Sequence, residues 1–443
     1  RRTAGIAAPA SVPTRVEGPK MSFDIPLSAY GRRVGPSRFS AGPLQEVMKQ
    51  EGAHVMAQGV PPVTALPIAS LSATLADGST VELDAVETRN AQRYAPFAWA
   101  PLRSWLLEHV REQHSPPSEH WDVSITAGSM LGIDAVLRLL LDPGDAVLCE
   151  EFTFLASKDN LLAAGATLLP LAMDEDGLLP SAVEEECEAR LAAGLPLPKL
   201  LYTIPVGQNP TGSRLRPDRY AAVYSAARRY GLVIVEDDAY YYMQHRAARP
   251  DMPLPGLSGL GPSFLSLDED GRVVRLDTFS KLLAPGFRLA WVTAPSPFVA
   301  KVDGLQYMSS QWGSTLSMLL LAKMLAAPGW LLGHVTALQA AMRTRCLALL
   351  AAAEEHLGGV ATWSVPQAGM FLWLTLAADY EPGPLLEAMR RHGVAVVPGE
   401  SCAAAPPPAG RRHLRLTYVI DPDQYNEGVR KVARVLGSAR VNI

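Results

Sequence analysis

The stretch from residue 121 to 295 alternates short apolar, β-rich runs with longer segments of helical character. This alternation predicts a mostly parallel sheet with helices on both faces, because parallel strands need crossover connections. Most of the runs are apolar without interruption, as is typical of strands that are buried on both faces. We therefore predict an α/β fold with seven strands at Val123–Thr126, Ala146–Cys149, Thr167–Leu171, Lys199–Ile204, Leu232–Glu236, Val273–Asp277 and Leu289–Thr293.

A second, smaller α+β unit is predicted downstream. Residues Leu316–Leu325 and Val335–His356 have the character of long helices, and further strands are expected around Thr362, Phe371, Val394 and Leu414. A chain of 443 residues is too long for one small core, which favours two domains. We expect an N-terminal extension at 1–21, an arm and part of the small domain at 22–93, a large domain at 94–335 and a C-terminal small domain at 336–443.

Composition restricts the class of partner. The formal net charge is −4 and both signs are spread along the chain, so we expect neither nucleic acid nor a membrane surface as a partner. The four cysteines lie far apart without a CxxC pair, which argues against a disulfide framework and a zinc site. The most apolar stretch, 318–335, is interrupted by Lys323, Pro328 and Gly329, and we interpret it as a core helix. A small molecule is the expected partner.

The first twenty residues differ from the rest of the chain. They hold Arg1, Arg2, Arg15 and Lys20 against the single acid Glu17. Two interpretations stay open: a remnant of an organellar transit peptide, or an upstream artefact with Met21 as the true start. The expected location is accordingly cytoplasmic, or mitochondrial or plastid in the first case.

The chemistry is expected where the strands end. In an open α/β sheet, ligands bind at the carboxyl ends of the strands. Lys281 follows the strand at 273–277 in the string Thr278-Phe279-Ser280-Lys281, with Arg288 a short loop further on. Such a lysine, flanked by hydroxyls and followed by an arginine, suits a phosphorylated cofactor, although taken alone it is most simply a solvated loop lysine.

Three further strand ends carry polar groups. Asp237 and Tyr240 follow the strand at 232–236, where a carboxylate can face a pyridinium nitrogen and a phenol can bind a 3′-oxygen. Metal binding by Asp237 and Asp238 is the weaker alternative, because no third ligand cluster accompanies them. Asn209 lies in a Pro-Val-Gly-Gln-Asn-Pro-Thr-Gly turn, and Ser129 opens a helix whose backbone N–H groups can bind an anion.

Together these elements resemble the fold-type I aminotransferases, especially the branch of kynurenine/2-aminoadipate and aromatic aminotransferases. The resemblance runs from about residue 22 to 439 and implies pyridoxal 5′-phosphate as cofactor, with Lys281 forming the Schiff base and later moving the proton. It implies Asp237 on the pyridine nitrogen, with Tyr240 and Asn209 on the 3′-oxygen. The implied phosphate contacts are Ser129, the backbone of Met130, Thr278, Arg288 and, from the partner subunit of a homodimer with shared active sites, Tyr94.

The resemblance also implies the substrate contacts. Phe154 would stack on the cofactor ring, and Arg415 would grip the substrate α-carboxylate, assisted by Asn209 and the backbone at Gly59. Phe371, Trp373, Tyr94 and Trp99 are candidates for lining the side-chain pocket, although aromatics at strand ends are more often core. Arg415 could equally be a surface strand residue.

The chain departs from this branch at three places. Phe154 stands where Tyr is usual, which keeps the stack and loses a phenol. Met130 stands where Gln is common, and Gly399-Glu400-Ser401-Cys402 replaces a glycine followed by Asn and an aromatic. The last departure concerns the side-chain specificity and leaves the chemistry intact.

The expected reaction is a ping-pong transfer of the amino group of an L-amino acid to a 2-oxo acid such as 2-oxoglutarate. Aromatic amino acids, kynurenine and 2-aminoadipate are the favoured donors. A β-lyase or decarboxylase on the same scaffold is the alternative, because the electron sink permits several bond cleavages. An aminotransferase-like regulator is a non-enzymatic alternative, disfavoured because the residues before Met21 are too few for a DNA-binding module.

Overall fold

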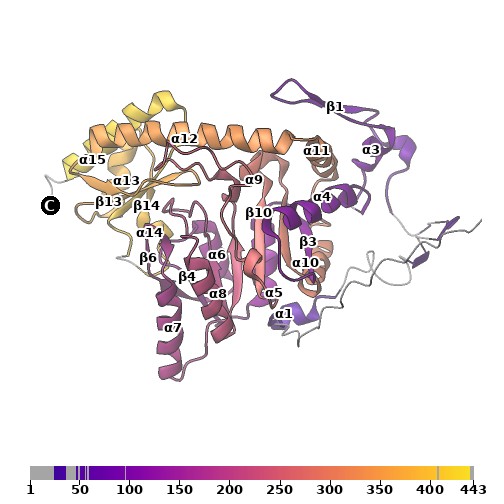
Figure 1. Ribbon diagram of the computed structural model, residues 1–443, viewed down its shortest axis with the longest axis horizontal. Coiled ribbons are helices and arrows are strands. Elements are labelled where there is room, and N and C mark those ends of the chain that lie inside the picture. Colours follow the sequence, from indigo (N-terminus) through magenta and orange to yellow (C-terminus); the bar gives the residue numbers. More distant parts are fainter. Residues whose placement is uncertain are drawn as a thin grey trace, which may run out of the picture.

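The computed structural model describes residues 24–35, 46–47, 50–54, 56, 59–94, 96–406 and 409–439. The expected N-terminal extension at 1–21, with both of its interpretations, lies outside the described residues. Figure 1 shows the arrangement: a large sheet with its helices in the middle, and the C-terminal elements gathered at one end.

The large sheet has the seven predicted strands, each within two residues of its expected bounds. Six of them run in the sense expected of a mostly parallel sheet, and β11 is antiparallel to both of its neighbours, so the predicted fold class is confirmed. The spatial order is β3 (Trp121–Thr126), β11 (Ala290–Pro295), β10 (Val273–Thr278), β9 (Val233–Asp237), β8 (Leu200–Thr203), β4 (Ala146–Glu150) and β5 (Thr167–Leu171).

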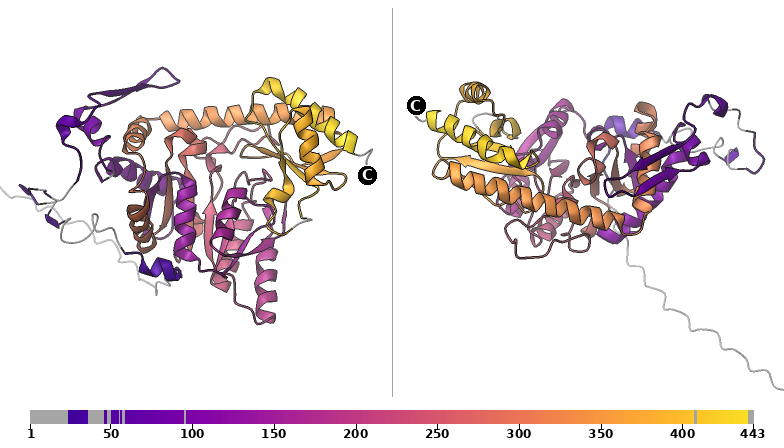
Figure 2. Two further views of the ribbon diagram at one scale, coloured as in Figure 1. Left: turned by 180° about the vertical axis from the view of Figure 1, so that it is seen from behind. Right: turned by 90° about the horizontal axis from the view of Figure 1, so that it is seen from above.

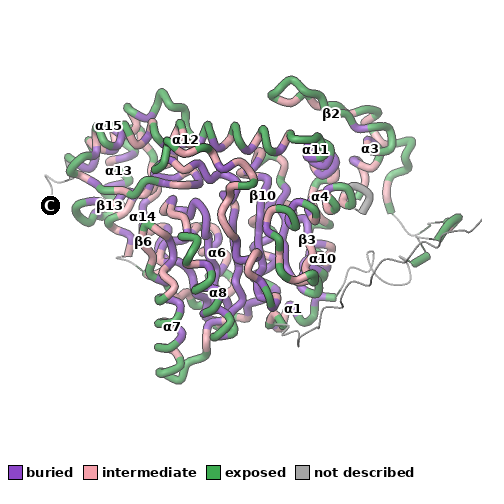
Figure 3. The backbone as a smooth tube through the Cα atoms, in the orientation of Figure 1, coloured by how far each residue is buried: buried purple, intermediate pink, exposed green. Residues whose placement is uncertain are grey.

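Helices cover both faces of this sheet, as parallel connections require. Successive strand residues alternate between two apolar cores, so that Val233 and Val235 belong to one and Ile234 to the other. The first core includes residues of α5 (Ser129–Leu140), α6 (Leu155–Ala163) and α10 (Ser296–Ser309). The second includes residues of α4 (Pro96–His114), α7 (Pro180–Ala192), α8 (Arg219–Tyr230) and α11 (Thr315–Ala326). Figure 3 shows the strands buried between helices with exposed outer faces.

The small sheet is antiparallel throughout, in the order β12 (Ala361–Trp363), β13 (Phe371–Leu376), β15 (His413–Thr417) and β14 (Val397–Pro398). The strands expected around Thr362, Phe371 and Leu414 are confirmed. The strand expected around Val394 begins three residues later, after Gly393 ends α13 (Pro382–His392) in a left-handed conformation. Residues of α12 (Trp330–Leu357), α13 and α15 (Tyr425–Ala439) pack against the buried face of this sheet.

The helix α12 connects the two sheets. It has 28 residues, so it spans about 42 Å at 1.5 Å per residue, and it begins five residues before the predicted helix at Val335–His356. Figure 1 shows it running along one side of the molecule from α11 to the C-terminal elements. The predicted domain boundary at 335/336 falls within it, and the four-part division stays a prediction.

The N-terminal part contacts helices that cover the large sheet. The short helix α1 (Ala29–Arg33) contacts α5, and β2 (Thr80–Leu83), which pairs with β1 (Leu71–Thr74), contacts α11. Figure 2 shows this hairpin at the end of the molecule opposite the C-terminal helices.

The most apolar stretch, 318–335, is core in its first half only: α11 ends at Ala326, residues 326–329 are exposed, and α12 begins at Trp330, so the single core helix predicted there is two helices. Met318, Leu319, Leu321 and Leu325 of α11 are buried against the large sheet's second core. Among the described residues no single helix has both the length and the apolar character to cross a membrane, and only α11 and α12 taken together pass such a test, across a 94° bend.

Candidate functional site

Lys281 lies in the single-turn helix α9 (Phe279–Leu282), directly after β10. The hydroxyl of Thr278 caps this helix by accepting a hydrogen bond from the Ser280 N–H at 3.1 Å. Burial, together with the positive charge of Arg288, lowers the pKa of Lys281 below its ordinary value. Among the described residues the ammonium group of this half-buried lysine has no hydrogen bond or ion pair.

Arg288 approaches the N-terminus of α5 at Gly128. Gly128 has φ +91°, a backbone conformation that favours glycine, and a Cβ atom at this position would displace the Arg288 guanidinium. The N-terminus of a helix carries a partial positive charge, and a cation held against it is unfavourable unless an anion lies between them. Ser129 and Met130 form the first turn of α5 beside this point. The residues present therefore fit a phosphate group.

Asp237 ends β9, the strand next to β10. It is 4% exposed, and one of its carboxylate oxygens accepts a hydrogen bond from the phenol of Tyr202 on β8. Burial raises the pKa of Asp237 to about 6, and the Tyr202 hydrogen bond opposes this rise because it stabilises the ionised form. Asp237 pairs in register with Leu276, two residues before Thr278, which puts the acid and the α9 lysine at the same edge of the sheet.

The neighbours of Asp237 serve a different purpose. Glu236 and Asp238 both contact the fully buried guanidinium of Arg275, at 3.1 and 2.9 Å, and Asp277 contacts it at 2.8 Å. Because strand side chains alternate, this cluster lies on the face of the sheet opposite to Asp237. Asp238 thus has an arginine partner, which removes the alternative of a metal shared by Asp237 and Asp238.

Arg415 on β15 reaches the large sheet across the boundary between the two sheets. Its Nη1 donates a 2.6 Å hydrogen bond to Oδ1 of Asn209, and Nδ2 of Asn209 lies 3.4 Å from the hydroxyl of Tyr240. The Arg415 guanidinium also stacks over the ring of Phe371, 4.2 Å from its centroid. The predicted contacts Asn209, Tyr240, Arg415 and Phe371 are therefore brought together from four separate segments, and Arg415 is no mere surface residue.

Other predicted residues lie apart from this cluster. Phe154 is half-buried at the N-cap of α6, where it packs against the same core as Tyr240. Tyr94 is 55% exposed in front of α4, and Gly59 is exposed with open space where a side chain would be. Neither has a recorded contact with Arg415 or Arg288. Trp99 packs in the second core, with the Arg103 guanidinium 5.0 Å from its ring, and so lies away from Phe371.

Two important residues escaped the sequence interpretation. Tyr202 lies in an apolar strand, and Arg275 is a single arginine among the apolar residues of β10. The signal was present, because a polar group in a strand buried on both faces needs a partner there. The identity of the partner depends on which strands are neighbours, which the sequence pattern leaves undefined.

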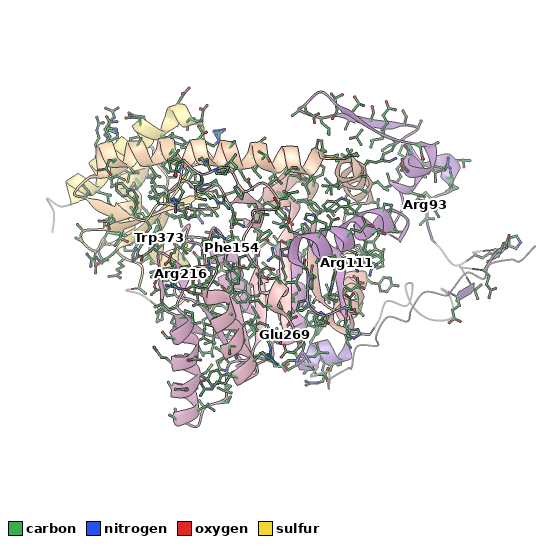
Figure 4. The ribbon with its side chains drawn as sticks, viewed as in Figure 1. Arg93, Arg111, Phe154, Arg216, Glu269 and Trp373 are labelled. Atoms are coloured by element: carbon green, nitrogen blue, oxygen red, sulfur yellow. The ribbon has the colours of Figure 1, made fainter. Side chains whose placement is uncertain are left out.

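A cleft of about 530 Å³ opens beside this site, between the two sheets. It is lined by the turn joining β6 (Met173–Asp174) to β7 (Gly177–Leu178), by residues 211–217, and by Trp373 and His413 of the small sheet. Trp373 stacks on His413, with ring centroids 5.1 Å apart. Figure 4 labels Trp373, Arg216 and Phe154 in this region. Lys281 and Asp237 do not line the cleft, so it is separate from the cluster described above.

The chain matches a known protein family over most of its length. The model of the family "Aminotransferase class I and II" matches residues 66–432. The bovine mitochondrial kynurenine/alpha-aminoadipate aminotransferase is 33% identical over 347 residues, which are 75% of this chain and 79% of that protein.

Solved structures show the same fold. The aminotransferase Aro8 from Candida albicans superimposes with a TM-score of 0.84 at 28% identity, covering 93% of this chain and 97% of that one. The kynurenine aminotransferase of Pyrococcus horikoshii, solved in complex with PMP, gives a TM-score of 0.72 at 28% identity, covering 79% and 83%. With most of its length matched in sequence and in fold, this chain belongs to the class I and II aminotransferases, a family of pyridoxal-phosphate-dependent enzymes of fold type I.

Proposed function

We propose that this chain binds pyridoxal 5′-phosphate through Lys281 and transfers the amino group of an aromatic amino acid, kynurenine or 2-aminoadipate to a 2-oxo acid such as 2-oxoglutarate. The observation that carries the proposal is the half-buried amine of Lys281, which shares one sheet edge with Asp237 and with the Arg288–Gly128 contact. An amine, an acid and an anion site at one edge are the groups that an aldehyde, a pyridine nitrogen and a phosphate require.

Each part of the cofactor has matching groups. The helix N-terminus at Ser129 and Met130, with Thr278 and Arg288, would hold the phosphate, and Tyr94 of the partner subunit would complete it in a homodimer. Asp237 would face the ring nitrogen, Asn209 and Tyr240 the 3′-oxygen, and Phe154 one face of the ring. When bound, the cofactor supplies an electron sink for the electron pair that remains when the substrate's α C–H bond breaks.

The side chains of this chain perform the remaining tasks. Arg415, preorganised by Asn209 and Phe371, would bind the substrate α-carboxylate with two parallel hydrogen bonds. Lys281 would accept the α-proton at Nζ and return it to a neighbouring carbon, a task that needs an unprotonated amine. The lowered pKa of Lys281 increases the unprotonated fraction at neutral pH. Asp237 must stay ionised to keep the ring nitrogen protonated.

The donor amino acid is inferred from the pocket and from the relatives. Phe371 offers an apolar surface directly beside Arg415, which suits an aromatic or long side chain. The bovine and Pyrococcus relatives are named for kynurenine, and the former also for alpha-aminoadipate. In a transfer by two half-reactions, Arg415 would bind the carboxylate of the donor first and that of the acceptor afterwards.

The first test is the absorbance spectrum of the protein with pyridoxal phosphate, before and after adding single amino acids without any 2-oxo acid. A bound-cofactor band that shifts to the pyridoxamine form supports amino transfer and ranks the donors. A band that never shifts, with ammonia or carbon dioxide among the products, would instead indicate the β-lyase or decarboxylase alternative. Gel filtration tests the homodimer, which a fully active monomer would contradict.

A further inference from the structure

The segment 399–404 follows β14 of the small sheet in the chain and contacts α6, the helix that begins after Phe154. The single-turn helix α14 (Gly399–Cys402) lies against the start of α6. The Thr153 N–H donates to the Cys402 carbonyl at 2.8 Å, and the Ala404 N–H donates to the Glu151 carbonyl at 2.9 Å. These backbone hydrogen bonds form a β-bridge between Phe152 and Ala403, which are 251 residues apart in the chain.

One charged side chain strengthens this junction. Nζ of Lys158, on α6, donates hydrogen bonds to the Ser401 carbonyl at 2.5 Å and to the Ala403 carbonyl at 3.2 Å. The last carbonyls of a helix have no partner within it and carry a partial negative charge, which a lysine satisfies. Lys158 is half-buried and has no recorded carboxylate partner among the described residues, so these two carbonyls are its defined contacts.

The junction is connected to Arg415 on both sides. α14 directly follows β14, whose Val397 pairs in register with Arg415. On the other side, Nε2 of Gln208 donates to the Phe152 carbonyl at 2.6 Å, and the next residue, Asn209, accepts the hydrogen bond from Arg415. The contacts therefore form a closed ring that runs from Arg415 through β14, α14, the 152–153 backbone and Gln208 back to Asn209.

We propose that Lys158 is a positioning residue for substrate binding: by fastening α14 to α6 it holds Arg415 in the orientation that binds the α-carboxylate. This inference rests on the proposed function of Arg415. Loss of the ammonium leaves the carbonyls of half-buried Ser401 and buried Ala403 without this donor and loosens α14 and the adjoining β14, so that the binding-competent arrangement is populated for less of the time. The apparent affinity then falls in proportion to that population.

The role is specific to the carboxylate. Lys158 itself touches neither the substrate nor the cofactor, and it acts through the strand that carries Arg415. A variant should therefore lower the affinity for ligands that have a carboxylate and leave the affinity for ligands without one unchanged. A merely structural role would weaken both kinds of ligand alike.

The test uses the enzyme loaded with pyridoxal phosphate and two probes, 3-phenylpropionate and its uncharged analogue 3-phenylpropanol, in calorimetric titrations. We expect Lys158→Met to weaken the binding of 3-phenylpropionate about tenfold. This is part of the energy of the charge-assisted hydrogen bonds between Arg415 and the carboxylate. Lys158→Arg, which retains donors and charge, should restore most of the affinity. In turnover, KM for the amino acid should rise while kcat changes by less than about threefold.

Lys199→Met is the matched control, because Lys199 is also half-buried and bonded, at 3.0 Å to Asp145, but lies away from α14. It should bind both probes as the unchanged enzyme does. A folded Lys158→Met protein with native affinity for 3-phenylpropionate, or with equal losses for both probes, would overturn the inference. Should that variant not fold, Lys158→Gln decides by the same two criteria.

The two levels of proposal can be told apart. If the unchanged enzyme itself fails to bind 3-phenylpropionate, the assignment of Arg415 to the carboxylate is wrong and the positioning role of Lys158 falls with it. If the unchanged enzyme binds and the Lys158 variants bind equally well, only the positioning role is wrong.

Discussion

The phenol of Tyr202 donates a hydrogen bond to the carboxylate of Asp237, with both side chains buried between neighbouring strands. Burial alone would favour the neutral acid, and the hydrogen bond from the phenol lowers the pKa of Asp237 and so stabilises the ionised form. We expect Tyr202→Phe to raise the pKa of Asp237 above its value of about 6, by roughly one unit for the loss of one charge-assisted hydrogen bond. The acid limb of the kcat/KM profile should move to higher pH by the same amount.

The control for this change is Tyr220→Phe. Tyr220 is equally buried, on α8, and its hydroxyl has no hydrogen-bond partner in the described structure. Its variant should leave the pH profile in place. Equal shifts in the two variants would show that any loss of a buried phenol has this effect and would remove the special role of Tyr202.

Lys281→Ala should lower kcat by at least about a thousandfold, because the proton acceptor at the α-carbon is lost. The fold should survive, since the ammonium group has no recorded hydrogen bond or ion pair among the described residues. Turnover of the best donor and the melting temperature of the cofactor-free protein provide the two measurements. Transamination at a near-native rate would contradict the assignment of Lys281.

Gly128→Ala should weaken the binding of pyridoxal phosphate about tenfold or more. The new methyl group displaces the Arg288 guanidinium, and the positive φ adds backbone strain of about 1 kcal/mol. Fluorescence titration of the cofactor-free protein measures the dissociation constant. Gly286→Ala, where the new Cβ meets nothing within 4 Å, is the control and should bind normally.

Arg415→Ala should reduce kcat/KM by about a hundredfold or more, because the two parallel bonds to the substrate carboxylate are lost. The absorbance of the bound cofactor should stay unchanged, since Arg415 reaches the cofactor region only through Asn209. Arg412→Ala, just before the same strand, removes an exposed pair with Asp379 and hydrogen bonds to the Leu376 and Ala377 carbonyls, and should have little effect. Kinetics at saturating 2-oxoglutarate separate the two variants.

Arg275→Met should destabilise the protein by about 3–5 kcal/mol, because three buried carboxyl groups lose their shared cation. Burial raises the pKa values of Glu236 and Asp277 in the folded protein. Arg275 opposes this rise, so its removal raises both pKa values further. A carboxyl group with a raised pKa loses its stabilising contribution as pH rises, so the defect should grow from acid toward neutral pH. Urea unfolding at several pH values measures it, with Arg229→Met at the exposed pair with Glu188 as control.

The helices, the strands and the polar groups at the strand ends were accessible from local patterns in the chain. An apolar run flanked by turn residues is a local pattern, so the seven strands were predictable, and the ends expected at Glu236 and Asp277 lie one residue before those observed at Asp237 and Thr278. The order of the strand-end groups along the chain was sufficient to identify the family. Boundaries were less certain, as the strand expected near Val394 shows, because helix and strand ends depend on capping and pairing.

Which of these groups meet depends on how the two sheets are arranged in space. The bond between Arg415 and Asn209 joins residues 206 apart, and those of Lys158 to α14 join residues 243 and 245 apart. Tyr202 and Arg275 were recognisable as polar groups in buried strands, but their partners depend on the spatial order of strands that are not consecutive in the chain. The chemistry of each side chain is known from its identity in the sequence. The pairing of buried polar groups follows from how the two sheets pack, and that packing is a property of the whole chain.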